Sequence, residues 1–150
     1  MKKSILYMLI LAVILVLPTK STDVGKLRPV QTVAAYKKGM FYEIRTDTKD
    51  WGRGESVAAA IKNLKATTPA TIYLDTAQYL IVSDVTLVNE MRPHFKDSVR
   101  ICQFTGEPPM EMVSKYLSAH SEEQTLGNWR TGESLPLLDC TKDRLIIVAK

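Results

Sequence analysis

Cysteine and histidine are scarce in this sequence, and their scarcity excludes several kinds of site. The 150 residues include two cysteines and two histidines. These numbers are too small for a disulfide-stabilised scaffold, a four-cysteine zinc site or a multi-histidine metal centre. A G-x-S-x-G nucleophile motif, a Walker lysine and a dinucleotide-binding glycine spacing are also missing. We therefore expect no cofactor, no metal and no enzymatic site.

An excess of charge of one sign is missing as well. Lys and Arg number 20 against 16 Asp and Glu, so the net charge is +4. Removal of residues 1–21 would take away Lys2, Lys3 and Lys20 and lower the net charge to +1. Nucleic-acid binding needs a concentrated basic face, so we expect no nucleic-acid partner. Hydrophobic residues at 45% and charged residues at 24% match an ordinary globular domain instead.

The N-terminus has the pattern of an export signal. Two lysines precede an unbroken apolar run of 13 residues, ILYMLILAVILVL, at positions 5–17. This length suits the core of a signal peptide and is short of the roughly 20 residues that span a bilayer. Thr19 and Ser21 fit the small-residue positions of a cleavage site, although both replace the preferred alanine. We expect residues 1–21 to be a signal peptide or an N-terminal anchor that inserts in the membrane during export. The folded part would then be extracytoplasmic, either secreted or anchored by residues 5–17.

The remaining sequence predicts a single α+β domain, with a mixed sheet and about three helices packed on it. Residues 22–28 are polar and indicate a tether, and residues 29–150 form the domain. Runs rich in β-branched and aromatic residues alternate with apolar stripes of helical period. The predicted strands are residues 30–37, 40–46, 71–74, 79–82, 99–105, 135–140 and 145–149, and the predicted helices are residues 55–66, 86–92 and 110–119.

A polar loop is expected at residues 47–54, DTKDWGRG. Its carboxylates suggest a calcium site, but Lys49 and Trp51 stand where an EF-hand requires oxygen ligands. The alternative is a solvated loop whose carboxylates pair with Lys49 and Arg53. Gly52 and Gly54 resemble a phosphate-binding turn without its lysine, and we interpret them as giving backbone freedom before the helix.

Tryptophan and arginine are enriched at binding hot spots, and they mark the residues that we expect to contact a partner. These candidate residues are Asp47, Asp50, Trp51, Arg53, Trp129 and Arg130. The alternative is that the two tryptophans cover the hydrophobic core.

The cysteines and histidines each allow two interpretations. Cys102 and Cys140 form either a disulfide between the central strand and the C-terminal hairpin, or two buried thiols. His94 and His120 are isolated in the sequence, and a catalytic base needs a nucleophile or an orienting acid beside it. The alternative function is therefore a small exported hydrolase or ligand-binding protein that uses His94 or His120 with nearby carboxylates.

A series of short motifs resembles a known family. It runs from a hairpin into GRGESVAAAIKNL, followed by TIYLD, YLIVSD, VRICQFTGEP and KYL. This order is similar to the N-terminal domain of the Ger(x)C family, the C subunit of spore germinant receptors, over about residues 30–120. Family members carry a lipid-anchoring cysteine after the signal and are more than twice as long; this chain has no such cysteine. The resemblance implies a setting in the spore envelope and an accessory role in germination.

These patterns together predict a non-enzymatic interaction domain at the outer face of a bacterial membrane. Its partner would be a protein of the membrane or envelope, whose identity the sequence does not reveal.

Overall fold

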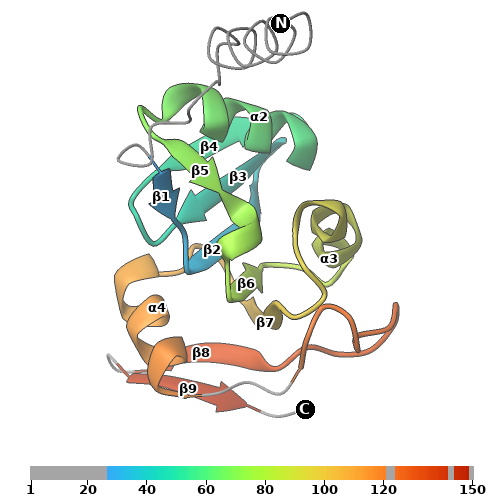
Figure 1. Cartoon of the computed structure of the whole chain (residues 1–150). Helices are drawn as coiled ribbons and strands as arrows, with labels where there is room; N and C mark the ends of the chain where they lie inside the picture. Colours follow the sequence, from blue (N-terminus) through green and yellow to red (C-terminus); the bar gives the residue numbers. More distant parts are fainter. Residues whose placement is uncertain (1–26, 121–123, 142–143, 149–150) are drawn as a thin grey trace, which may run out of the picture.

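A seven-stranded mixed sheet forms the centre of the molecule, with the strand order β4-β3-β2-β6-β7-β8-β9 (Figure 1). The computed structural model describes residues 27–120, 124–141 and 144–148. In chain order the strands of this sheet are β2 (Thr32–Lys38), β3 (Phe41–Thr46), β4 (Trp51–Gly54), β6 (Tyr79–Val82), β7 (Arg100–Phe104), β8 (Leu137–Thr141) and β9 (Arg144–Val148). The predicted export segment, residues 1–21, lies outside the described residues.

Parallel pairing occupies the middle of this sheet. β2, β6, β7 and β8 are parallel neighbours, whereas β3, β4 and β9 pair antiparallel toward the two edges. Parallel strands are usually covered on both faces and are therefore apolar throughout. All four residues of β6, with the sequence YLIV, are buried, which confirms the prediction of a strand covered on both faces.

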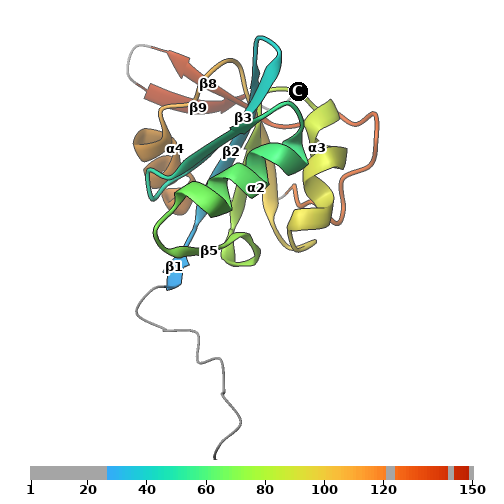
Figure 2. The same cartoon turned by 90° about the horizontal axis from the view of Figure 1, so that it is seen from above.

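Within the described residues, three α-helices cover the two faces unequally (Figure 2). α2 (Val57–Thr67) and α3 (Thr86–Met91) contribute to the larger core on one face, and α4 (Met110–Ala119) packs on the other. The alternation along β6 separates the two cores, because Leu80 belongs to the first and Ile81 to the second. The predicted α+β domain with a mixed sheet and three helices is confirmed.

The first helix, α2, forms for local reasons. The hydroxyl of Ser56 accepts a hydrogen bond from the backbone N–H of Ala59 at 3.1 Å and caps the helix. The helix therefore begins after Ser56, two residues later than predicted. Its apolar stripe is buried as predicted: Val57, Ala60, Ile61 and Leu64.

The polar loop predicted at residues 47–54 is wrong in its second half, because Trp51–Gly54 form the edge strand β4. A Cβ atom on Gly52 would lie 2.3 Å from the carbonyl oxygen of Ala60, and one on Gly54 would lie 2.5 Å from the nitrogen of Ala60. The two glycines therefore allow α2 to pack directly on β4. This close approach corrects our interpretation that they supply backbone freedom before the helix.

The folded domain begins earlier than residue 29. Leu27–Pro29 form β1, which pairs in parallel with β5 (Thr71–Tyr73) in a separate two-stranded sheet. The guanidinium of Arg28 lies 3.1 Å from the carboxylate of Asp50. The last two residues of the predicted tether thus belong to the domain.

Candidate functional site

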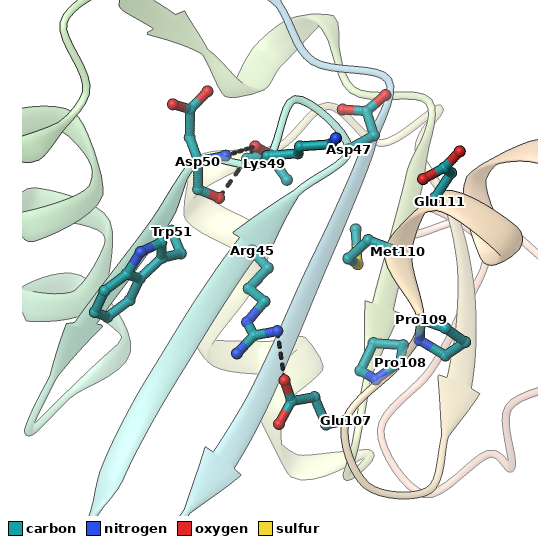
Figure 3. A pocket seen from close by; sticks show the side chains of 11 residues that line it. Arg45, Asp47, Lys49, Asp50, Trp51, Glu107, Pro108, Pro109, Met110 and Glu111 are labelled. Carbon is teal, nitrogen blue, oxygen red and sulfur yellow. Dashed lines mark hydrogen bonds and ion pairs between the residues drawn. The ribbon is translucent and has the colours of Figure 1, made fainter.

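A groove of about 640 Å³ lies between the β3–β4 edge of the sheet and the turn that leads into α4. It is lined by residues 45–47, 49–51 and 107–111. Figure 3 shows Arg45 of β3 near its centre, Trp51 of β4 on one side, and Pro109 and Met110 at the start of α4 on the other. Three of the residues predicted to contact a partner, Asp47, Asp50 and Trp51, therefore lie in one groove.

The groove exists because α4 covers only part of its face of the sheet. The core beneath α4 draws on β2, β6, β7 and β8, and on no residue of β3 or β4. Residues directly opposite each other in an antiparallel pair point to the same face. Arg45 pairs with Ala34 of that core, and Trp51 pairs with Arg45. Both side chains therefore lie on the α4 face of the sheet, beside the helix.

A network of charged side chains fills the uncovered part of this face. The carboxylate of Glu43 is buried and accepts a hydrogen bond from the Tyr36 hydroxyl at 2.9 Å. Arg45 and Arg53 approach this carboxylate at 3.7 and 3.9 Å. Burial, reinforced by the hydrogen bond to Glu43, raises the pKa of Tyr36 well above its ordinary value of 10.0. Arg53 also stacks on the ring of Phe41, with its guanidinium 4.2 Å from the ring centroid.

The turn before α4 joins this network through Glu107. Its carboxylate forms ion pairs with Arg45 and, at 3.2 Å, with Lys38. The hydrogen bond from Lys38 lowers the pKa of Glu107, and the charge of Arg45 acts in the same direction. These contacts tie the α4 side of the groove to the hairpin formed by β2 and β3.

Hydrogen bonds hold the two aspartates at the other end of the groove. Asp47 accepts from the backbone N–H of Gln31 at 3.2 Å. Asp50 accepts from the Thr48 hydroxyl at 2.7 Å and from Arg28 at 3.1 Å. We expected Lys49 and Arg53 to neutralise these carboxylates, and the observed partner of Asp50 is Arg28 instead. Among the described residues no cluster of His, Cys, Asp and Glu is suited to a metal ion.

Trp129 is not a surface residue, so its assignment as a partner-binding residue is wrong. Its side chain is 2% exposed, and the indole N–H donates to the carbonyl oxygen of Glu133 at 3.1 Å. Arg92 donates to the carbonyl oxygen of Trp129 at 3.0 Å and holds this segment on the core. The alternative, a tryptophan that covers the core, holds for Trp129 but not for Trp51, which is 56% exposed. Arg130 is exposed and, like Arg53, does not line the groove.

Cys102 is buried in β7, in the core beneath α4. β8 runs parallel to β7, with Gln103 opposite Leu137. Extended by one residue, this register sets position 136 opposite Cys102. The backbone of Cys140 lies four residues beyond that position, or about 13 Å along the strand. A disulfide joins Cα atoms roughly 4.4–6.8 Å apart. The side chain of Cys140 lies outside the described residues, so the disulfide stays a prediction that the register does not favour.

The two histidines lie in different environments. His94 lines a second hollow of about 630 Å³, which it shares with Lys65 and Asp75. Burial, and secondly the charge of Lys65, lowers the pKa of His94 below its ordinary value of 6.5. His120 is exposed, stacks on the ring of Tyr116 with centroids 4.1 Å apart, and lies with Nδ1 2.9 Å from the carbonyl oxygen of Tyr116. His94 therefore shares a hollow with a carboxylate, whereas His120 lines neither this hollow nor the groove.

Sequence reasoning missed one whole side of the groove. Glu107, Met110 and Glu111 line it from the α4 side, and none of them carries a binding motif. The available signal was the pair Pro108-Pro109, which holds the chain extended immediately before a helix.

Comparison with known proteins leaves the groove as the basis for assigning a function. No family model, no curated protein and no solved structure matches this chain. Within the part of the chain that the structure describes, no helix has the length and apolar character needed to cross a bilayer.

Proposed function

We propose that this chain is an exported, non-enzymatic binding domain that acts at the outer face of a bacterial membrane and recognises its partner through the groove. The observation that carries the proposal is the convergence of Asp47, Asp50 and Trp51 with the turn before α4. Tryptophan and arginine are enriched at binding hot spots, and the groove contains Trp51 and Arg45. The ion pairs of Arg45 and Glu107 pre-organise the surface before a partner arrives.

Export is proposed from the apolar run at residues 5–17, and a protein of the membrane or envelope is the partner that the sequence predicts. The similarity to the Ger(x)C family supports a setting in the spore envelope and an accessory role in germination. Germination genes beside this gene, and delayed germination of spores that lack it, are the observations expected from that setting. Fractionation of the producing cells should recover the chain outside the cytoplasm.

Photo-crosslinking can test the groove as the binding surface. A photoreactive amino acid replaces Glu111, which is exposed on the α4 side of the groove, in the full chain. The control replaces Lys62, which is exposed on α2 at the opposite face of the sheet. We expect a specific crosslink from position 111 that disappears when Trp51→Ala is added, and none from position 62. Equal crosslinking from both positions would contradict the proposal.

A second candidate function follows from the hollow at His94. His94, Asp75 and Lys65 share it, and a concave site with a titratable pair is where hydrolytic or ligand-binding chemistry is sought. In the described part of the chain no hydrogen bond joins His94 to Asp75. For this reason we rank the hollow as a weaker candidate site than the groove. If His94→Ala abolished a cellular phenotype that Trp51→Ala and His120→Ala left intact, the second candidate would replace the first.

A further inference from the structure

The charges around the groove cancel. Four carboxylates line it, from Asp47, Asp50, Glu107 and Glu111, together with two cations, Arg45 and Lys49. The cations Arg28 and Lys38 pair with two of these carboxylates from outside the lining, and Glu43 approaches both Arg45 and Arg53 beside it. With these four neighbours counted, five negative groups meet five positive groups, so the groove has no net charge that would attract a charged polymer. The groove does contain charged hydrogen-bonding groups of both signs. Such groups form stronger hydrogen bonds to a neutral hydroxyl than uncharged donors and acceptors do.

Side chains of α2 obstruct the edge of the sheet beside the groove. The outward N–H of Arg53 donates to the Asn63 side chain at 3.1 Å. The Thr67 hydroxyl lies 3.4 Å from the carbonyl oxygen of Trp51, although its nearer acceptor is the carbonyl oxygen of Asn63 at 2.9 Å. Because these side chains stand where an extended peptide would pair with the backbone, we assign ligand recognition to the side chains of the groove.

The side chains that remain are of two kinds. Trp51 is 56% exposed at one wall, and Pro109 and Met110 form an apolar wall opposite (Figure 3). Asp47, Lys49 and their neighbours supply donors and acceptors along the same groove. A sugar ring has the same division, with an apolar face of C–H groups and a rim of hydroxyl groups. The volume of about 640 Å³ also lies within the usual range of small-ligand sites.

We propose that the groove binds a neutral saccharide, with a pyranose ring against the indole of Trp51. Its hydroxyl groups bond to the charged groups of Asp47, Lys49 and Glu111. This inference rests on the proposed function, because it takes the groove as the binding surface. It specifies the chemistry that the groove recognises on its membrane or envelope partner as carbohydrate.

Titration with oligosaccharides tests the inference. The full chain is held in a polyoxyethylene detergent, because detergents with sugar headgroups would compete for the groove. The probes are neutral chitotetraose and cellotetraose, an anionic tetragalacturonate, and hexalysine and hexaglutamate peptides. Binding is followed by tryptophan fluorescence and by saturation transfer from the protein to the sugar protons. The fluorescence change reports on Trp51, because Trp129 is 2% exposed in the core.

We expect a neutral oligosaccharide to bind and to change the fluorescence. Trp51→Ala should weaken binding about tenfold or more, and Trp51→Phe should weaken it less because a smaller ring remains. The control variant Lys62→Ala, at an exposed residue of α2 on the opposite face of the sheet, should bind as the parent chain does.

Three results would overturn the inference. The first is equal saccharide binding by the parent chain and Trp51→Ala. The second is failure of both neutral oligosaccharides to bind at concentrations up to about 10 mM. A site with a dissociation constant of about 1 mM would be almost fully occupied at that concentration. The third is Trp51-dependent binding of a charged peptide or of tetragalacturonate with none of the neutral sugars. In the third case the proposed function stands and only the ligand class is wrong, while the Glu111 crosslink decides the proposed function separately.

Discussion

Replacing Glu43 by Ala is expected to lower the free energy of unfolding by about 2–3 kcal/mol. The Glu43 side chain is 8% exposed and accepts a 2.9 Å hydrogen bond from Tyr36, which is itself buried. Loss of the acceptor leaves a buried hydroxyl unsatisfied, which costs about 1–3 kcal/mol. Arg45 and Arg53 contribute less than about 1 kcal/mol each, because their side chains are 34% and 47% exposed and water screens the pairs.

The isosteric variant Glu43→Gln separates the hydrogen bond from the charge. Its amide oxygen can still accept from Tyr36, so we expect a loss of about 1 kcal/mol, at most half that of Glu43→Ala. Unfolding by urea, followed through the fluorescence of buried Trp129, measures both losses. The reasoning is refuted if Glu43→Ala costs less than about 0.5 kcal/mol, or if the two variants are equally destabilised.

The same network predicts how stability depends on alkaline pH. The folded pKa of Tyr36 is raised, so above about pH 10 the unfolded state releases the phenolic proton while the folded state keeps it. The folded state then binds more protons, and its stability falls as the pH rises, by up to about 1.4 kcal/mol per pH unit. A Tyr36→Phe variant should lose this part of the alkaline fall. An unchanged alkaline profile in that variant would show that Tyr36 is not the group responsible.

Three further outcomes are expected. Leu64→Ala should lower the free energy of unfolding by about 2–5 kcal/mol in a urea titration, because Leu64 is 0% exposed. A loss below about 0.5 kcal/mol would mean that the buried face of α2 is wrongly assigned. Gly52→Ala should cost about 3 kcal/mol or prevent folding, because its Cβ would meet the backbone of Ala60. The control Gly39→Ala, at φ 63° in open space, should cost about 1 kcal/mol. Equal losses in the two variants would contradict this explanation. Thermal unfolding should show stability falling below about pH 6.5, because the lowered pKa of His94 lets the unfolded state bind the proton more tightly, and His94→Gln should lose this part of the fall.

The elements that could be predicted are those with a strong local pattern. α2 combines alanines with an apolar stripe that recurs at helical spacing, and the structure buries that stripe. β6 is apolar at every position because strands pair with it on both sides and helices cover both faces. In both cases the local preference and the tertiary environment agree.

The missed strands depend on contacts that no local pattern reveals. β4 has the sequence WGRG, and glycine lowers strand propensity, yet the glycines are what allow α2 to lie on the strand. β1 is three residues long and is defined by parallel pairing with β5, which follows more than 40 residues later. Both are tertiary effects that override a weak local preference.

One side of the candidate site could be predicted from the sequence, and the other side could not, because it depends on tertiary contacts. Asp47, Asp50 and Trp51 stand out locally, because an aromatic residue lies among charged residues in a turn. Glu107 and its neighbours form the opposite side only because the turn after β7 brings Glu107 to Lys38 of β2 and Arg45 of β3, which lie two and three strands away from β7 in the sheet. Trp129 gave the same local signal as Trp51 and is buried, since the carbonyl groups of its segment are held by Arg92 on the core. Composition alone does not distinguish the two tryptophans.

The groove itself follows from how β3 and β4 divide their side chains between the two faces of the sheet. Toward α2 they present Ile44 and the two glycines, so a helix can pack closely. Toward α4 they present Glu43 and Arg45, whose charges a helix could cover only by removing them from water. α4 therefore packs over the middle of the sheet and leaves this edge open, with Trp51 half exposed beside it. A face that cannot be closed by the domain's own apolar residues, yet has a fixed shape, suits recognition of another molecule better than stability.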